Sequence, residues 1–123
     1  MAGPLEGIRV LDLSAVLSGP IAAGMLADQG ADVVKIESPD GDTSRRIGPR
    51  KADISAMFLA ANRGKRSLVL DLKQAAAQQI VRELAQRADV LVENFRPGAM
   101  DRLGLGHEAL LALNPRLVYL SIS

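Results

Sequence analysis

Ala88-Asp-Val-Leu-Val-Glu-Asn-Phe-Arg-Pro-Gly98 is the stretch from which the fold of this chain is inferred. An apolar run, Val90 to Val92, breaks into a polar turn that Pro97 and Gly98 close. This pattern predicts a buried strand whose carboxyl end opens into a loop, followed by a new helix. Ligands of open α/β sheets bind at such carboxyl ends. The turn also places an amide, an aromatic ring and a guanidinium side by side, a set that suits a ligand with both a ring and phosphate groups.

Strand and helix patterns alternate along the rest of the 123 residues. Because the connections between strands are too long for hairpins, we expect the strands to run parallel. The sequence therefore predicts an α/β fold, a Rossmann-like parallel sheet of about five strands with flanking helices. The other predicted strands are residues 8–13, 33–36, 67–72 and 117–122, and the predicted helices are 20–29, 54–61, 74–87, 98–103 and 107–113.

Two of the predicted helices show an apolar face. In residues 74–87 and the residue after them, apolar side chains at 77, 80, 81, 84, 85 and 88 form one stripe. In residues 20–29, we expect Ile21, Ala22, Met25 and Leu26 to share one apolar face.

The composition is that of an ordinary globular protein with an aliphatic core. Hydrophobic residues make up 48% of the chain and charged residues 24%, whereas aromatic residues make up only 2%. A formal net charge of +1 argues against a nucleic-acid partner, and no apolar run reaches the ~18 residues of a membrane span. The absence of cysteine excludes disulfides and thiolate metal sites, and it fits a reducing cytoplasm.

The first strand-to-helix turn lacks the glycine pattern of dinucleotide-binding folds. That pattern, G-x-G-x-x-G, lets the backbone approach a pyrophosphate. Here Gly19 stands alone and is followed by Pro20, which has no N–H to donate. Glu37 stands near the place of a ribose-binding acid, but we expect it to be a solvated strand end. Binding of nicotinamide cofactors is therefore disfavoured.

Familiar catalytic and metal-binding patterns are also missing from the sequence. His107 is the only histidine, and we expect it at the surface. With no cysteine and a single histidine, a Ser-His-Asp or Cys-His site built from this chain alone is not expected, and no metal-ligand spacing occurs. Asp12 and Asp71 lie on predicted strands, where an inward carboxylate could serve as an acid, a base or a nucleophile but is more often a structural group at a strand end.

Basic residues gather in loops, and most of them follow a predicted strand. On a parallel sheet many would therefore reach the carboxyl edge, where they would form an anion-binding rim for a phosphorylated small molecule. For each residue taken singly, the alternative is an exposed loop position. The set comprises Arg45, Arg46, Arg50, Lys51, Arg63, Lys65, Arg66, Lys73, Arg96 and Arg102.

A series of segments resembles, in order and with matching spacing, the class III CoA-transferases. This family includes formyl-CoA transferase, the carnitine CoA-transferases and α-methylacyl-CoA racemase. The likeness is strongest at residues 88–98 and covers nearly the whole chain. The other segments are Pro4-Leu-Glu-Gly-Ile-Arg-Val-Leu-Asp-Leu-Ser14 with Gly19-Pro20, Leu26-Ala-Asp-Gln-Gly-Ala-Asp-Val-Val-Lys-Ile-Glu37, Asn62-Arg-Gly-Lys-Arg-Ser67, Leu70-Asp-Leu-Lys73, Arg102-Leu-Gly-Leu-Gly106 and Asn114-Pro-Arg-Leu117.

The resemblance implies that residues 1–123 are the N-terminal part of a Rossmann-like CoA-binding domain in a larger two-domain protein. Family members are about three times this length and form interlocked homodimers. Their substrates are an acyl-CoA and a carboxylic acid, with no covalently bound cofactor. The resemblance points to no nucleic-acid or membrane partner, and to a cytoplasmic enzyme.

The resemblance also implies where the chemistry lies. In the transferases an aspartate attacks the donor acyl-CoA and forms a mixed anhydride. The CoA thiolate then attacks the aspartyl carbonyl, and the resulting enzyme-bound thioester passes CoA to the acceptor carboxylate. That aspartate is expected beyond Ser123, so no catalytic residue is assigned within this chain. In the racemases of the same family a histidine and an aspartate, also expected beyond Ser123, exchange the α-proton instead.

Ten residues match positions that bind CoA in the family. Leu17 and Ser18 match backbone that lines the thiol end of CoA. Residues 70–73 match the segment that holds the adenosine, residues 94–96 match the loop beside the nucleotide and the pantetheine arm, and Arg102 matches a phosphate-contacting arginine. Ser38 departs from the arginine that several members carry, so Arg45 or Arg46 would have to substitute. The full set is Leu17, Ser18, Leu70, Asp71, Leu72, Lys73, Asn94, Phe95, Arg96 and Arg102.

Two alternatives to a CoA-transferase stay open on the sequence. One is a 2-methylacyl-CoA racemase of the same family. The other, from a different class, is a non-catalytic module of 123 residues that binds a nucleotide or mediates dimerisation.

Overall fold

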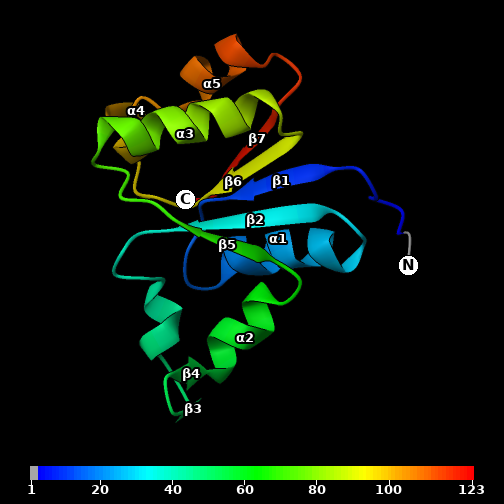
Figure 1. Cartoon of the computed structure of the whole chain (residues 1–123), viewed down its shortest axis with the longest axis vertical. Coiled ribbons are helices and arrows are strands. Elements are labelled where there is room, and N and C mark those ends of the chain that lie inside the picture. Colours follow the sequence, from blue (N-terminus) through cyan, green and yellow to red (C-terminus); the bar gives the residue numbers. More distant parts are fainter. Residues whose placement is uncertain (1–2) are drawn as a thin grey trace.

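The computed structural model describes residues 3–123 as helices packed on the two faces of a parallel sheet (Figure 1). The sheet has five strands in the order β5-β2-β1-β6-β7, and each neighbouring pair is parallel. This confirms the predicted α/β class and strand number. The strands are β1 (Arg9–Asp12), β2 (Asp32–Glu37), β5 (Arg66–Val69), β6 (Val90–Glu93) and β7 (Val118–Ser121).

Helices from different parts of the chain cover the two faces. Below the sheet in Figure 1 lie α1 (Ser18–Asp28) and, beside it, α2 (Ala56–Asn62). Above the sheet lie α3 (Ala75–Gln86), α4 (Ala99–Arg102) and α5 (His107–Leu113). None of the helices described in residues 3–123 has the length and apolar character needed to cross a bilayer.

The strand order reverses at the centre of the sheet. From β1 the chain moves outward through β2 to β5, then crosses to β6 on the other side of β1 and continues to β7. β1 and β6 pair directly, with Leu11 opposite Leu91 and Asp12 opposite Val92. The carboxyl ends of these two strands therefore form a topological switch point, where open α/β sheets place their ligands. The stretch 88–98 supplies one side of it.

The core is split by the sheet into two apolar clusters. Leu11 and Leu91 belong to the cluster above the sheet, together with Val81 of α3. Val10 and Val92 belong to the cluster below, together with Ala23 of α1. Successive side chains on one strand thus enter opposite clusters, which explains why these strands appear in the sequence as continuous apolar runs.

One part of the structure was not predicted. Between β2 and β5 the chain forms a 3-10 helix, η1 (Thr43–Arg46), and a small antiparallel hairpin of β3 (Arg50–Lys51) and β4 (Ile54–Ser55), which extends away from the sheet (Figure 1). Strands of two residues are too short to show any hydrophobic period, so the sequence offered no signal for them. Residues 54–55, predicted as the start of a helix, belong to this hairpin.

The predicted apolar face of α1 is only partly correct, because Leu26 packs on the cluster below the sheet, whereas Ile21 and Met25 are exposed. Ile21 is 39% exposed and Met25 is 60% exposed, whereas Ala23 and Gly24 are buried. The reason is the close approach of α2, because a Cβ atom on Gly24 would lie 3.0 Å from the carbonyl oxygen of Ala61. The helix packs on α2 through small residues there, and Ile21 and Met25 are left exposed.

Candidate functional site

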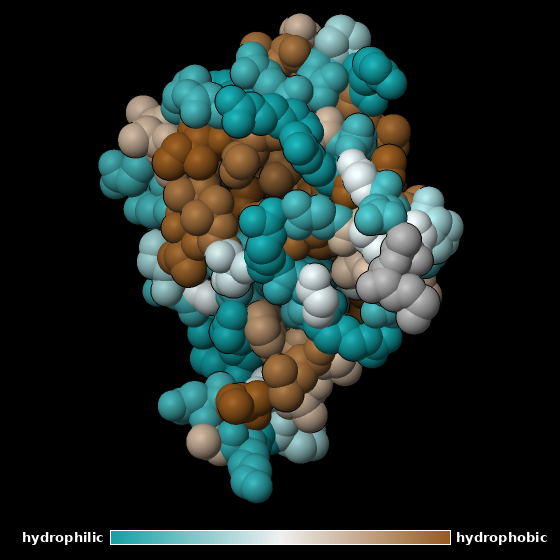
Figure 2. Space-filling model, turned by 45° about the vertical axis from the view of Figure 1, so that its right-hand side comes forward, coloured by the Kyte–Doolittle hydropathy of each residue, from teal (hydrophilic) through white to brown (hydrophobic). Residues whose placement is uncertain are grey.

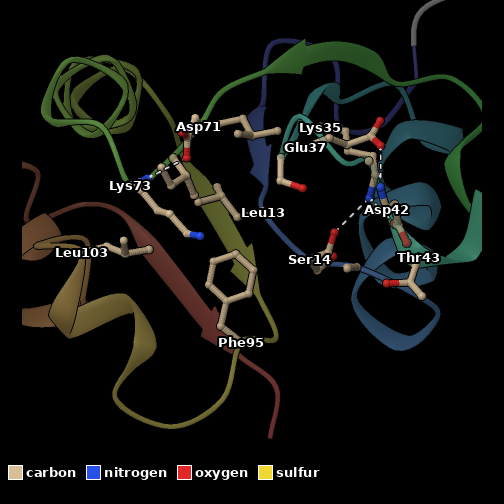
Figure 3. A pocket seen from close by; sticks show the side chains of 15 residues that line it. Leu13, Ser14, Lys35, Glu37, Asp42, Thr43, Asp71, Lys73, Phe95 and Leu103 are labelled. Carbon is tan, nitrogen blue, oxygen red and sulfur yellow. Dashed lines mark hydrogen bonds and ion pairs between the residues drawn. The ribbon is translucent and has the colours of Figure 1, made fainter.

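A cavity of about 350 Å³ opens at the carboxyl ends of β1, β2, β5 and β6. Asp71, Lys73, Phe95 and Leu103 lie on one side of it, and Ser14, Asp42 and Thr43 lie on the other, with Leu13 between them (Figure 3). The remaining lining residues are Ala15, Lys35, Ile36, Glu37, Ser38, Gly41 and Leu72.

The turn between β1 and α1 forms one wall of this cavity, and side chains from several elements hold its backbone. Both polar groups of Ala15 bind the Asn94 amide: its N–H donates to Oδ1 at 2.9 Å, and its carbonyl accepts from Nδ2 at 2.7 Å. The Ser14 carbonyl accepts from Lys35 Nζ at 2.9 Å, and the Val16 N–H donates to Asp42 Oδ1 at 3.0 Å. The conformation of residues 14–16 is thus set by residues distant in the sequence.

Val16 shows that this turn is strained. Its φ is +71°, a left-handed conformation that a β-branched residue rarely adopts. Such conformations persist only where the surrounding structure imposes them, and they cluster at ligand sites.

Gly19 is required by packing at the start of α1. A Cβ atom at this position would collide with the Ser14 side chain. The single glycine of the turn therefore allows the helix to begin against Ser14, which is a different role from that of a pyrophosphate-binding glycine. Leu17, at the N-cap, offers no side-chain hydrogen bond to the first amides of α1, which leaves those amides without a side-chain cap.

Asp12 is a structural carboxylate beneath the same turn. It is fully buried and accepts hydrogen bonds from the amide and hydroxyl of Ser14. Lys65 Nζ lies 2.7 Å from its other oxygen and also donates to the Pro20 carbonyl and to Asn62 Oδ1, both at 2.8 Å. Burial lowers the pKa of Lys65, and the hydrogen bond that Lys65 donates to Asp12 opposes that effect. These contacts occupy Asp12 and exclude it as a free acid or nucleophile.

Glu37 is not the solvated strand end that the sequence suggested. It is only 5% exposed, because Arg45 binds it with two hydrogen bonds, at 2.8 Å from Nε and 2.7 Å from Nη2. The hydrogen bond from the Arg45 guanidinium holds the pKa of Glu37 below its usual range. The guanidinium also stacks 3.7 Å above the ring of Phe58. Arg45 is therefore engaged within the protein, which weakens its candidacy as a substitute phosphate ligand in place of the arginine missing at Ser38.

Asp42 and Lys35 form a buried ion pair on the cavity wall. Their side chains are 1% and 2% exposed, and Nζ lies 2.9 Å from Oδ2. Burial alone would raise the pKa of Asp42, but contacts with Lys35, with the amide and hydroxyl of Ser44 and with the Val16 amide together lower it. Sequence analysis missed both residues. Lys35 in the middle of an apolar strand was the available signal, because a lysine there must find a buried partner.

The structure brings seven of the ten predicted ligand residues to surfaces around the switch point. Asp71, Leu72, Lys73 and Phe95 line the cavity of about 350 Å³. Ser18, Asn94, Phe95 and Arg96 line an adjoining depression of about 470 Å³. The other three lie nearby: Leu17 is exposed at the N-cap of α1, Leu70 packs on the upper core cluster, and Arg102 is exposed, with Nη1 close to Gly98.

The predicted basic rim is smaller than the sequence suggested. Arg63 precedes β5 and Arg66 is its first residue, so both lie at the opposite edge of the sheet, where they pair with Asp28 and Asp32 at 2.7 Å. Lys65 is buried against Asp12. Lys73, Arg96 and Arg102 are exposed and make no ion pair within residues 3–123. These three remain available to an anionic ligand.

Two further expectations concern His107 and metal binding. His107 is exposed, as expected, and its ring makes an edge contact with Tyr119. In residues 3–123 no cluster of three or more histidine, aspartate or glutamate side chains is arranged to hold a metal ion.

Comparison with known proteins shows the family to which this chain is similar. The sequence pattern of CoA-transferase family III matches residues 5–123. The acetyl-CoA:oxalate CoA-transferase of Acetobacter aceti is 50% identical over 122 residues, which are 98% of this chain and 31% of that protein. The succinate–glutarate CoA-transferase of Agrobacterium fabrum is 48% identical over 98% of this chain and 32% of its own. The chain thus spans about a third of the length of these curated relatives.

Solved structures agree with the sequence matches. The crystal structure of a CAIB/BAIF family protein from Brucella suis superposes with a TM-score of 0.94 at 43% identity, over the whole of this chain and 34% of that one. The five-stranded sheet and its flanking helices therefore correspond to one part of a larger protein.

Proposed function

We propose, from the premise that this chain belongs to CoA-transferase family III, that it forms the CoA-binding part of an enzyme that transfers CoA between an acyl-CoA and a carboxylic acid. CoA or acyl-CoA is the substrate that this part holds. The relatives named above are transferases that act on short dicarboxylic acids, as their names state, and this favours transfer over the racemisation that other family members perform.

One observation carries the proposal. Segments that are far apart in the sequence, around residues 13–15, 35–43, 71–73 and 95, line a single cavity at the switch point of the sheet (Figure 3). A switch point is where α/β sheets bind nucleotides, and Phe95 and Lys73 offer an aromatic face and a cation for a nucleotide ring and its phosphates.

We assign the ten residues to parts of CoA as the family likeness suggests. The turn at Leu17 and Ser18 would face the thiol end, and Leu70 to Lys73 would hold the adenosine. Asn94, Phe95 and Arg96 would flank the nucleotide and the pantetheine arm, and Arg102 would contact a phosphate. Asn94 also has a structural role, because its side-chain amide binds both the N–H and the carbonyl of Ala15.

Calorimetric titration of the complete protein with CoA tests the binding assignment. Replacing Arg96 and Arg102 together by alanine should weaken CoA binding at least tenfold, because a hydrogen bond between charged groups contributes about 1.5–3 kcal/mol. Arg63→Ala is the matched control, since Arg63 is an exposed arginine at the opposite sheet edge. Unchanged affinity in the double variant would refute the assignment of these two arginines.

A transfer assay tests the reaction itself. The complete protein is incubated with acetyl-CoA and oxalate, and with succinyl-CoA and glutarate, and the formation of the new acyl-CoA is followed by mass spectrometry. CoA transfer to either acid supports the proposal. If the protein binds CoA but only exchanges the α-proton of a 2-methylacyl-CoA, the racemase alternative is correct.

We also propose that the complete protein is a cytoplasmic homodimer. The family likeness supports the dimer, and a chain without cysteine fits a reducing compartment. Light scattering of the purified complete protein measures its mass, and a monomer would contradict the proposal.

A further inference from the structure

The buried pair Lys35 and Asp42 contacts both ends of the strained turn. Lys35 Nζ donates to the Ser14 carbonyl at 2.9 Å, and Asp42 Oδ1 accepts from the Val16 amide at 3.0 Å. The two side chains also contact each other at 2.9 Å. The ion pair therefore closes a loop of contacts around residues 14–16, and neither residue belongs to the ten that were assigned to the ligand.

Burying this ion pair costs the protein free energy. Removing two charges from water costs several kcal/mol per ion, and apolar residues of similar size are often more stable at such positions. General stability is therefore a weak reason for these charges. A more specific reason for these charges is that their partners are polar backbone atoms, which apolar side chains could not hold in place.

The bend itself needs holding. A left-handed φ is unfavourable for an ordinary residue, and Val16 carries this conformation at φ +71° on a partly exposed turn. The residues that follow, Leu17 and Ser18, begin α1, and Ser18 lines the depression that Asn94, Phe95 and Arg96 also line. A change of φ at Val16 would redirect the backbone at Leu17 and Ser18, which follow it directly.

We propose that Lys35 and Asp42 are positioning residues: their ion pair holds the bend at Ser14–Val16 so that the backbone of Leu17 and Ser18 faces bound CoA. This proposal rests on the proposed function. Asp42 acts through the Val16 amide, and its own orientation is fixed by Ser44, whose amide and hydroxyl donate to the same oxygen at 2.9 Å and 2.8 Å.

The test measures CoA affinity by calorimetry in the complete protein, with a urea unfolding midpoint for each variant. Asp42→Asn keeps the shape of the side chain and removes its charge, and we expect CoA binding to weaken about tenfold. Val16→Gly removes the strain, because glycine adopts this φ freely. If Asp42 acts by holding the bend, Asp42→Asn should cost less affinity in the Val16→Gly background, while its effect on the unfolding midpoint should be the same in both backgrounds.

A second variant keeps the test decisive if Asp42→Asn does not fold. Val16 is partly exposed, so proline can be placed there. Val16→Pro fixes φ near −65° and removes the N–H that donates to Asp42. CoA binding should therefore again fall about tenfold or more. Wild-type affinity in Val16→Pro, or equal losses from Asp42→Asn in both backgrounds, would overturn the proposal. Absence of CoA binding by the unmodified protein would instead refute the proposed function.

Discussion

Three buried carboxylates near the carboxyl edge of the sheet each have a basic partner. Asp12 binds Lys65, Asp42 binds Lys35 and Glu37 binds Arg45, at N–O distances of 2.7–2.9 Å. Because each oxygen pair is engaged, none of these acids is poised to attack a substrate. At the level of single residues, these three acids are held by contacts within the protein, which supports the proposed role of this cavity in binding.

The pairing of Glu37 with Arg45 predicts a pH dependence of stability. The pKa of Glu37 is lowered in the folded protein by the hydrogen bond from Arg45. A carboxylate with a depressed folded pKa stabilises the fold above its unfolded pKa, and this contribution is lost as the pH falls through the folded pKa. Glu37→Gln should therefore lower the urea midpoint at neutral pH, by an amount that corresponds to about 1–2 kcal/mol, and the two proteins should converge in acid.

Urea unfolding from about pH 7 to about pH 3 measures this difference. Asp53→Asn is the matched control, since Asp53 is exposed and makes no ion pair in the described residues. If the gap between wild type and Glu37→Gln stays constant across the pH range, the charge of Glu37 is not what stabilises this loop.

At the scale of elements, the sequence predicted the strands well because their apolar runs are continuous. β1, β2, β5, β6 and β7 all fall within a few residues of their predicted positions. The parts that the sequence did not predict depend on contacts between distant residues. The outward face of α1 follows from its contact with α2 at Ala61, and the burial of Glu37 follows from Arg45 folding back through η1. No local pattern encodes either contact.

The packing of α1 gives a prediction at this scale. Ala23 is fully buried in the cluster below the sheet, whereas Met25, two residues later, is 60% exposed. Ala23→Leu should overpack this layer and destabilise the protein by about 1–3 kcal/mol, while Met25→Gln should stay within about 0.5 kcal/mol of wild type. Urea midpoints of the two variants measure the effect. If Met25→Gln lost more stability than Ala23→Leu, Met25 would be a buried residue, as the sequence predicted, and this packing of α1 would be contradicted.

Over the whole molecule, apolar side chains remain exposed on several elements. Figure 2 shows a broad hydrophobic area in the upper half of the face in view and a smaller one near the bottom, at the height of the β3–β4 hairpin and α2 in Figure 1. Ile54 of β4 and Leu59 of α2 are both exposed apolar residues. Hydrophobic surface of this kind often marks a site of association.

The edge strand β7 combines exposed apolar side chains with an unpaired backbone edge. Val118 is 61% exposed and Leu120 is 42% exposed on one face of the strand, while Tyr119 packs on the upper core cluster. Within the described residues β7 pairs only with β6, so the outer edge keeps unpaired backbone groups that can bind another strand.

The 123-residue chain, prepared alone, should therefore self-associate through β7. Its apparent mass in size-exclusion chromatography with light scattering should rise with concentration. Replacing Val118 and Leu120 together by lysine should suppress the rise, since charged side chains oppose pairing at a sheet edge, whereas Leu113→Lys, at an exposed position on α5, should leave it in place. A wild-type chain that stays monomeric at all concentrations would show that this edge is protected by its own twist and by the side chains around it.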